Sequence, residues 1–127
     1  MPMKSRLTYV GIRVTDLEKS IEFYTKVLGM TVAGRGKIDQ TKGENVGLQT
    51  EAGGYMLELN YYGKDSQFNT KYVAGDGLDH IAFKVDDLDK ALEEAEKAGH
   101  RTVLQMEAGG NRWVYIEDPD GNWIELF

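Results

Sequence analysis

The chain has 127 residues, of which 41% are hydrophobic and 28% are charged, and its net charge at pH 7 is -6. A chain of this length and balance forms one globular domain, and its lack of cysteine excludes disulfides, thiolate metal sites and cysteine nucleophiles. The acidic balance argues against nucleic acid as a partner, because phosphate binding needs clustered Lys and Arg. No apolar run approaches the roughly 18 residues of a membrane-spanning helix, and MPMKSRLTYV lacks the apolar core of a signal peptide. We therefore expect a cytoplasmic protein with no membrane partner.

The first predicted element is a strand over residues 9–14, where apolar side chains occupy alternate positions. A helix follows, because Thr15 and Glu18 form a capping box and Gly29 ends the apolar periodicity. Strands are expected at residues 46–50 and 55–61. The glycine-rich, charged stretch GRGKIDQTKG, residues 34–43, is predicted to be a loop with at most short strand character. The inward stripe of the helix is predicted to consist of Leu17, Ile21, Tyr24 and Leu28.

The second half of the chain has the same succession of elements. A strand begins at His80, and Asp86 or Asp87 caps a helix that ends at Gly99. Further strands are expected at residues 101–106, 112–117 and 122–127, with the turn DPDG before the last of them. The inward positions of this second helix are predicted to be Leu88, Leu92 and Ala95.

The two halves are copies of one unit. When Tyr9 is aligned with His80, the first strand and the helix of one half match those of the other. The last strands of the two halves match when residues are omitted from the middle of the alignment. We therefore predict a single domain, residues 1–127, made of module one (6–63), a linker (64–76) and module two (77–127). The linker is interpreted as a solvated connector, with a lid carried by Phe68 and Tyr72 as the alternative. The matched pairs include Val14 with Val85, Leu17 with Leu88, Gly29 with Gly99, and Glu58 with Glu125.

Four side chains lie at matching places on the strand faces opposite the apolar residues: Tyr9, Glu58, His80 and Glu125. If the modules are related by a pseudo-twofold axis, all four converge. Two carboxylates and an imidazole suit a divalent metal such as Ni, Zn, Co, Fe or Mn, with an oxygen of a small-molecule substrate completing the shell. Such a site polarises a carbonyl while one carboxylate moves protons at the adjacent carbon. The alternative is that both glutamates lie on a solvated face and His80 is a structural residue.

Three motifs resemble the vicinal oxygen chelate (VOC) superfamily, which groups glyoxalase I, bleomycin resistance proteins and dioxygenases. They are RVTDLEKSIEFYTKVLGM (13–30), LDHIAFKVDDLDKALEEAEKAGH (78–100) and EDPDGNWIEL (117–126). The resemblance implies an α+β fold of two tandem βαβββ modules forming a curved mixed sheet, and a homodimer. It also implies activity like that of glyoxalase I, lactoylglutathione lyase, which isomerises the hemithioacetal of a small 2-oxo compound and a thiol. By position, the metal ligands become Glu58, His80 and Glu125, with Glu125, or alternatively Glu58, as the base.

The sequence departs from the glyoxalase I pattern at two positions. Tyr9 stands where the family has a His or Gln ligand, and Tyr62 replaces an asparagine that resembles a glutathione contact. Arg13 matches the arginine that helps to hold the glutathione carboxylate. Together these residues indicate either a retained metal centre with an altered substrate, or a site that has lost part of its shell.

Three other functions remain open at this point. A non-catalytic resistance protein would hold an aromatic ligand between tyrosines and tryptophans without turning it over. An extradiol dioxygenase is ranked lower, because it uses two histidines and one glutamate and Tyr9 occupies the place of the missing histidine. An epimerase of the acyl-CoA type needs the same enolate stabilisation, although nothing in the sequence identifies a CoA pocket. The aromatic residues considered for the resistance function are Tyr61, Tyr62, Tyr115 and Trp113.

Overall fold

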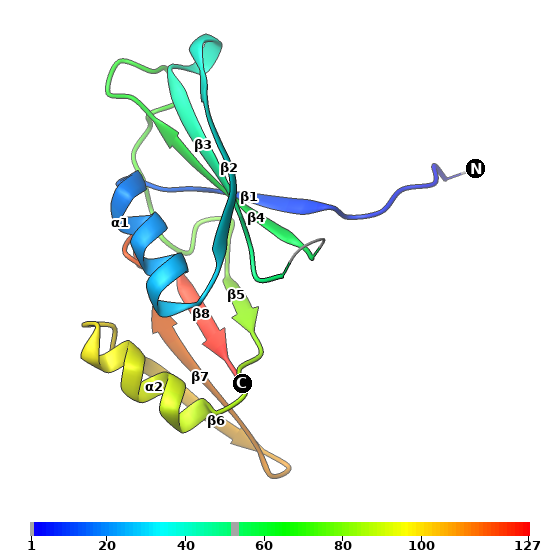
Figure 1. The fold of residues 1–127 in the computed structure, drawn as a ribbon, viewed down its shortest axis with the longest axis vertical. Helices are drawn as coiled ribbons and strands as arrows, with labels where there is room; N and C mark the ends of the chain where they lie inside the picture. The colour runs from blue at the N-terminus through cyan, green and yellow to red at the C-terminus, as the bar shows by residue number, and fades with distance from the viewer. Residues whose placement is uncertain (1, 52–53) are drawn as a thin grey trace. The chain divides into compact units, whose positions relative to one another are not determined.

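A computed structural model describes residues 2–51 and 54–127, and the chain divides into two compact units, Met1–Thr70 and Lys71–Phe127. Among the described residues, each unit contains one α-helix and a four-stranded sheet (Figure 1). The elements of the first unit are β1 (Tyr9–Arg13), α1 (Leu17–Glu22) continued by a π-helical turn (Phe23–Val27), β2 (Thr31–Ile38), a 3-10 turn (Asp39–Thr41), β3 (Gly43–Gln49) and β4 (Met56–Tyr62). Those of the second unit are β5 (His80–Phe83), α2 (Leu88–Lys97), β6 (Thr102–Ala108), β7 (Asn111–Glu117) and β8 (Trp123–Leu126).

The two sheets have the same topology. Their strand orders are β1-β4-β3-β2 and β5-β8-β7-β6, with the first pair parallel and the others antiparallel. The registers also agree, because Tyr9 lies opposite Met56 in one unit and His80 opposite Trp123 in the other. The α+β fold of two βαβββ modules is therefore confirmed.

One face of each sheet forms a hydrophobic core, as the alternation of apolar residues predicts. In the first unit α1 contacts β4 on this face, and in the second unit Ala95 of α2 is buried. Side chains on the opposite face are those that remain for binding and chemistry. The buried strand residues are Ile12, Val46, Leu48, Leu57 and Leu59 in the first unit, and Val114, Ile116, Ile124 and Leu126 in the second.

The predicted loop at residues 34–43 is largely strand. β2 continues to Ile38 and pairs with β3, so that Gly36 lies opposite Asn45 and Lys37 opposite Glu44. Every residue of β2 is exposed, which explains why its sequence lacks the apolar alternation that would have indicated a strand. Backbone pairing with β3, rather than side-chain burial, holds this edge strand in place.

The first helix also differs in detail from its prediction. Asp16, not Thr15, is the N-cap, and its carboxylate accepts a hydrogen bond from the Lys19 backbone N–H at 3.1 Å. The π-helical turn shifts the inward face, so that Ser20 and Phe23 are buried together with Leu17 and Tyr24. The predicted inward residues Ile21 and Leu28 are instead only partly buried. In the second helix the cap is Asp87, which accepts from the Lys90 N–H at 3.1 Å.

Two aromatic residues of the predicted linker make contacts within their own units. In the first unit the ring of Phe68 packs against Tyr62 with a centroid separation of 5.6 Å. In the second unit the hydroxyl of Tyr72 donates to Asn122 Oδ1 at 2.7 Å. These contacts do not support the lid alternative, because both aromatic side chains are engaged by their own units.

Ser20 offers a direct test of the packing of the first unit. Its side chain is fully buried, and among the residues that the structure describes its hydroxyl has no hydrogen-bond partner. An unsatisfied buried hydroxyl is costly, and alanine is a better helix former. We expect Ser20→Ala to raise the free energy of unfolding by about 1 kcal/mol, measured by denaturant titration followed by circular dichroism. A lower stability of the variant would contradict this interpretation.

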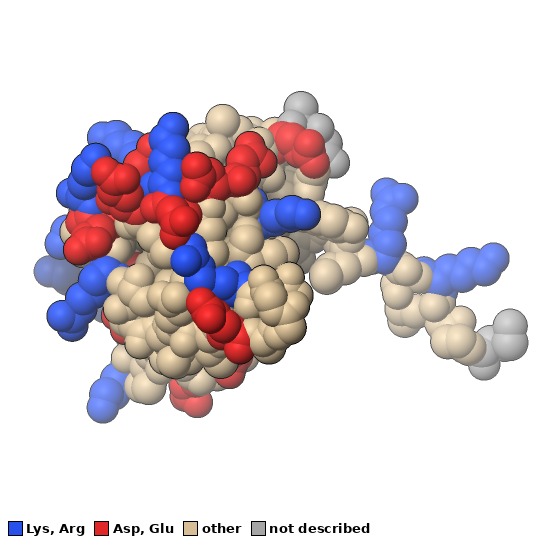
Figure 2. Space-filling view, turned by 90° about the horizontal axis from the view of Figure 1, so that it is seen from below, with Lys and Arg blue, Asp and Glu red and all other residues tan. Residues whose placement is uncertain are grey.

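The surface shows mixed charge. On the face in Figure 2, acidic and basic side chains of the described residues are interspersed, except on the extended N-terminal segment, where the charged side chains are basic. None of the helices in the described part of the chain has the length and apolar character that crossing a bilayer requires.

Candidate functional site

The second unit places His80 and Glu125 side by side. Ala82 of β5 lies opposite Glu125 of β8, and His80 lies two positions earlier on the same face of the sheet. The Nε2 atom of His80 is 3.9 Å from Glu125 Oε1. The histidine side chain is 37% exposed and the glutamate side chain 18% exposed, so both groups are accessible from one side. The sequence analysis placed both residues among four side chains that converge if the two modules are related by a pseudo-twofold axis.

Tyr115 contacts both members of the pair. It lies opposite Glu125 on β7, and its hydroxyl donates to Glu125 Oε1 at 2.8 Å. Its ring meets that of His80 edge to face, with centroids 5.5 Å apart and planes at 87°. The hydrogen bond to Glu125 raises the pKa of the Tyr115 phenol, and burial and the charges of Glu125 and Asp79 act in the same direction. The phenol therefore remains a hydrogen-bond donor at neutral pH.

Asp79 holds the other side of the imidazole. Its Oδ1 atom is 2.7 Å from His80 Nδ1, and its side chain is 91% exposed. This contact leaves Nε2 as the ring nitrogen that is directed at Glu125. The sequence analysis did not assign a role to Asp79, although its position immediately before the histidine could have indicated a contact with the imidazole.

In the first unit Glu58 lies between two glycines. Gly11 of β1 and Gly47 of β3 both lie opposite it in the sheet register. A Cβ atom on Gly11 would lie 3.8 Å from Glu58 Oε1 and only 3.0 Å from the amide nitrogen of Asn60. The absence of a side chain at Gly11 therefore leaves room around the carboxylate. In the second unit the places of the two glycines are taken by Ala82 and Tyr115.

Three other residues that the sequence singled out lie in the first unit. Tyr9 is 53% exposed, at the position in β1 that His80 has in β5. The guanidinium of Arg13 donates to Asn69 Oδ1 at 3.2 Å and to the side-chain and backbone oxygens of Thr70. Tyr62 is occupied by its contact with Phe68. The predicted role of Arg13 in binding a carboxylate would require the arginine to change hydrogen-bond partners.

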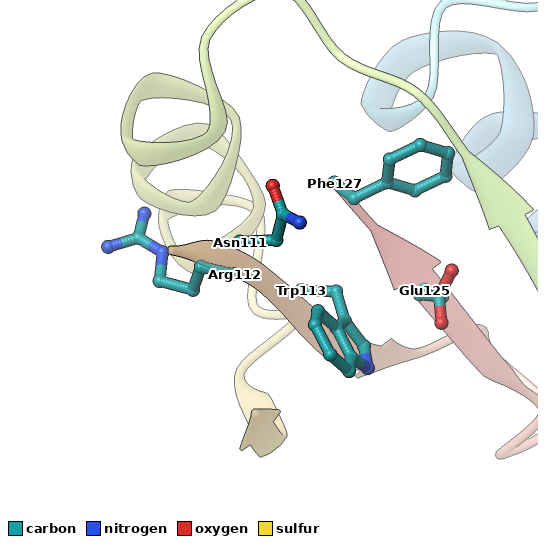
Figure 3. Close-up of a pocket in the computed structure, with 5 residues that line it drawn as sticks. All are labelled: Asn111, Arg112, Trp113, Glu125 and Phe127. Atoms are coloured by element: carbon teal, nitrogen blue, oxygen red, sulfur yellow. The ribbon is translucent and has the colours of Figure 1, made fainter. Parts of the chain in front are cut away.

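A hollow of about 680 Å³ lies beside Glu125 in the second unit (Figure 3). Figure 3 shows the Glu125 carboxylate on β8, with the indole of Trp113 and the ring of Phe127 near it. Arg112, which also lines the hollow, forms an ion pair with Asp89 of α2. The hollow is large enough for a small organic molecule and places an acidic group next to apolar rings.

The side chains that the sequence singled out are of types that can bind a divalent metal. Within each unit's described residues, no group of three or more His, Asp or Glu side chains could hold an ion. Glu58 lies opposite two glycines in the first unit, and His80 lies beside Glu125 in the second. Two carboxylates and an imidazole are oxygen and nitrogen donors that Zn, Ni, Co, Fe and Mn accept.

Comparison with known proteins identifies the family. Residues 6–126 match the profile of the Glyoxalase/Bleomycin resistance protein/Dioxygenase superfamily. The chain belongs to this superfamily. A lactoylglutathione lyase of Escherichia coli O157:H7 is 35% identical to this chain. The match covers 95% of this chain and 90% of the Escherichia coli protein. A lactoylglutathione lyase of Arabidopsis thaliana is 33% identical over 95% of this chain, and this chain spans only 43% of that protein.

A solved structure of a superfamily member agrees with these relatives. The trypanothione-dependent glyoxalase I of Leishmania major superposes with a TM-score of 0.78 and 29% identity, covering 98% of this chain and 86% of its own. The resemblance predicted from the sequence motifs is thus confirmed. The two relatives from Escherichia coli and Arabidopsis are both lactoylglutathione lyases.

Proposed function

We propose that this chain is a glyoxalase I-type lyase that isomerises the hemithioacetal of a small 2-oxo aldehyde and a thiol. The observation that carries the proposal is the His80–Glu125 pair, with Nε2 and Oε1 3.9 Å apart on the open face of the second sheet. Glu58 has the corresponding position in the first sheet. The lactoylglutathione lyase relatives support the reaction class.

His80, Glu58 and Glu125 would hold a divalent metal ion, as is general in glyoxalase I enzymes. Such an ion, when bound, polarises substrate oxygens and stabilises the negative charge that develops when a neighbouring C–H bond is broken. Tyr9 is exposed at the fourth position, where its hydroxyl would donate a hydrogen bond to a substrate oxygen.

The carboxylate of Glu125, with Glu58 as the alternative, would move the proton. It would remove the proton from the carbon that carries the thioether and hydroxyl groups and return it to the neighbouring carbonyl carbon. The hydroxyl hydrogen passes to the former carbonyl oxygen, so the product is a 2-hydroxy thioester with the same atoms as the substrate. A positioned base of this kind contributes roughly 10²–10⁴ in rate.

We expect this chain to recognise the thiol part of its substrate differently from the way in which its relatives recognise glutathione. The Arg13 guanidinium is bonded to Asn69 and Thr70, and Tyr62 packs on Phe68. If Arg13 and Tyr62 contact the substrate, they do so after exchanging these partners. The hollow beside Trp113 and Phe127 would receive the apolar part of the 2-oxo compound.

We also infer that the protein acts as a homodimer in the cytoplasm. β1 and β5 are edge strands of their sheets, and an edge strand can pair with a second copy of the chain. Light scattering of the purified protein measures the number of copies.

The test removes and replaces the metal. The protein is stripped with a chelator, reloaded separately with Ni, Zn, Co, Fe and Mn, and assayed for thioester formation from a preformed hemithioacetal. We expect one or more metals to restore turnover, and His80→Ala to bind metal weakly and to lose at least about 10² in activity. His100→Ala is the matched control, because it alters the only other histidine. Full turnover by the stripped wild type would contradict the proposal.

A binding protein of the resistance type is the second candidate, and the hollow beside Glu125 favours it. Trp113 and Phe127 give this hollow of about 680 Å³ two aromatic walls. Such a protein would bind an aromatic ligand equally well with and without metal and release it unchanged. Calorimetry on the stripped protein, followed by analysis of the recovered ligand, separates this function from the lyase.

A further inference from the structure

We propose that Asp79 and Tyr115 are positioning residues that preset His80 and Glu125 for ligation. Asp79 acts on His80, and Tyr115 holds Glu125 and packs against His80. The purpose of this arrangement depends on the proposed function, but the arrangement itself is a property of the metal-free chain. Neither residue would touch the substrate's reacting carbon or the ion. Both act by fixing which atoms of the two ligands are presented and in which direction.

The argument for Asp79 comes from the chemistry of imidazole. A neutral imidazole carries one N–H, and the hydrogen bond made by one ring nitrogen decides which nitrogen keeps a lone pair. The Asp79 carboxylate accepts only, so its contact of 2.7 Å with Nδ1 selects the tautomer with hydrogen on Nδ1. The lone pair then lies on Nε2, the nitrogen that is 3.9 Å from Glu125 Oε1. A metal ligand needs this lone pair.

The side chain of Asp79 is 91% exposed, so its contact with His80 adds little to stability. A merely structural role would be detected as a loss of stability, whereas a positioning role changes the tautomer. The two interpretations therefore predict different results for the same variant.

The argument for Tyr115 comes from its two contacts. Its hydroxyl donates a hydrogen bond to Glu125 Oε1 at 2.8 Å, and its ring packs edge to face with the imidazole of His80. The carboxylate is thereby turned toward the imidazole and held there. Hydrogen-bonded partners of this kind orient metal ligands, and their loss costs about 10–100-fold in metal affinity. Phenylalanine at this position would keep the ring contact and remove only the hydroxyl.

The first experiment reads the His80 tautomer in the metal-free protein. Long-range ¹⁵N–¹H correlation spectra distinguish the protonated from the unprotonated nitrogen of a neutral imidazole. We expect wild-type His80 to carry hydrogen on Nδ1 and Asp79→Ala to shift the population toward hydrogen on Nε2. Asp79→Asn, whose amide oxygen still accepts from Nδ1–H, should retain more of the wild-type tautomer than Asp79→Ala does.

Two controls accompany this experiment. The signals of His100 should not change, and Asp76→Ala, which removes an exposed carboxylate from the same segment, should leave His80 as in the wild type. The proposal for Asp79 is overturned if His80 carries hydrogen on Nε2 in the wild type, or if Asp79→Ala does not alter its tautomer.

The second experiment tests Tyr115→Phe. In the metal-free protein the side-chain ¹³C carboxylate signal of Glu125 should move, because one hydrogen bond is lost. Titration with Zn or Co should show affinity weakened by about 10–100-fold, with circular dichroism confirming that the fold is retained. Tyr55→Phe is the control, because Tyr55 is strongly exposed on the other unit. An unmoved Glu125 signal overturns the role of Tyr115.

The outcomes distinguish this inference from the proposed function. If the wild type binds no metal, the lyase proposal fails, while the tautomer and carboxylate signals still decide whether Asp79 and Tyr115 position the pair. If the wild type binds metal and catalyses the reaction, but the Asp79 and Tyr115 variants match it in spectra and affinity, only the positioning inference fails.

Discussion

Glu125→Gln should lower kcat for hemithioacetal isomerisation by roughly 10²–10⁴. The amide keeps the size of the side chain and an oxygen that can accept from the Tyr115 hydroxyl, now 2.8 Å from Oε1, but it cannot take up the substrate proton. The measurement is the rate of thioester formation by the metal-loaded protein, together with metal content by elemental analysis. The two readings separate the role of Glu125 as a base from its role as a ligand.

Comparison with Glu58→Gln decides which glutamate moves the proton. The variant that retains metal but loses turnover identifies the base, and a variant that loses both identifies a ligand. Glu107→Gln, at an exposed position of β6, is the control and should match the wild type. If Glu125→Gln left both metal binding and turnover intact, the assignment of the site would be wrong.

Asp118→Ala should lower the free energy of unfolding of the second unit by roughly 2–4 kcal/mol. The carboxylate is buried at the turn before β8 and accepts from the backbone N–H groups of Asp120 at 2.9 Å and Asn122 at 2.8 Å. It also accepts from the Asn122 side-chain amide at 3.0 Å. Alanine would leave these donors without their charged acceptor. The same turn begins the strand that carries Glu125, so loss of activity should accompany the loss of stability.

The two tryptophans make this measurement specific. Trp113 and Trp123 both lie in the unit Lys71–Phe127, so indole fluorescence during urea unfolding reports on that unit. Asp76→Ala, an exposed change in the same unit, should leave the midpoint unchanged. Tyr72→Phe, which removes one hydrogen bond to Asn122, should cost about 1 kcal/mol. An Asp118→Ala midpoint equal to that of the wild type would show that the buried turn does not depend on this carboxylate.

The residues of the site differ in how far the sequence alone predicted their roles. His80 and Glu125 were found by comparing the halves of the chain, because a repeat shows which strand positions correspond, and strand alternation shows which face each residue occupies. Tyr115 was read only as an aromatic that a ligand could contact. Its hydrogen bond to Glu125 depends on the pairing of β7 with β8, which places residues that are ten apart in sequence directly opposite each other. Local sequence does not specify such a pair.

By itself, the sequence determined that the two halves repeat one unit, that a helix follows the first strand of each half, and which face of those strands is apolar, since these depend on local spacing and side-chain type. Tertiary structure decided the extent of β2, whose exposed residues are held by pairing with β3. It also decided the neighbours of Glu58, because strand register places Gly11 and Gly47 on either side of it. Register is set by hydrogen bonds between segments far apart in the chain, and no local pattern of residues contains that information.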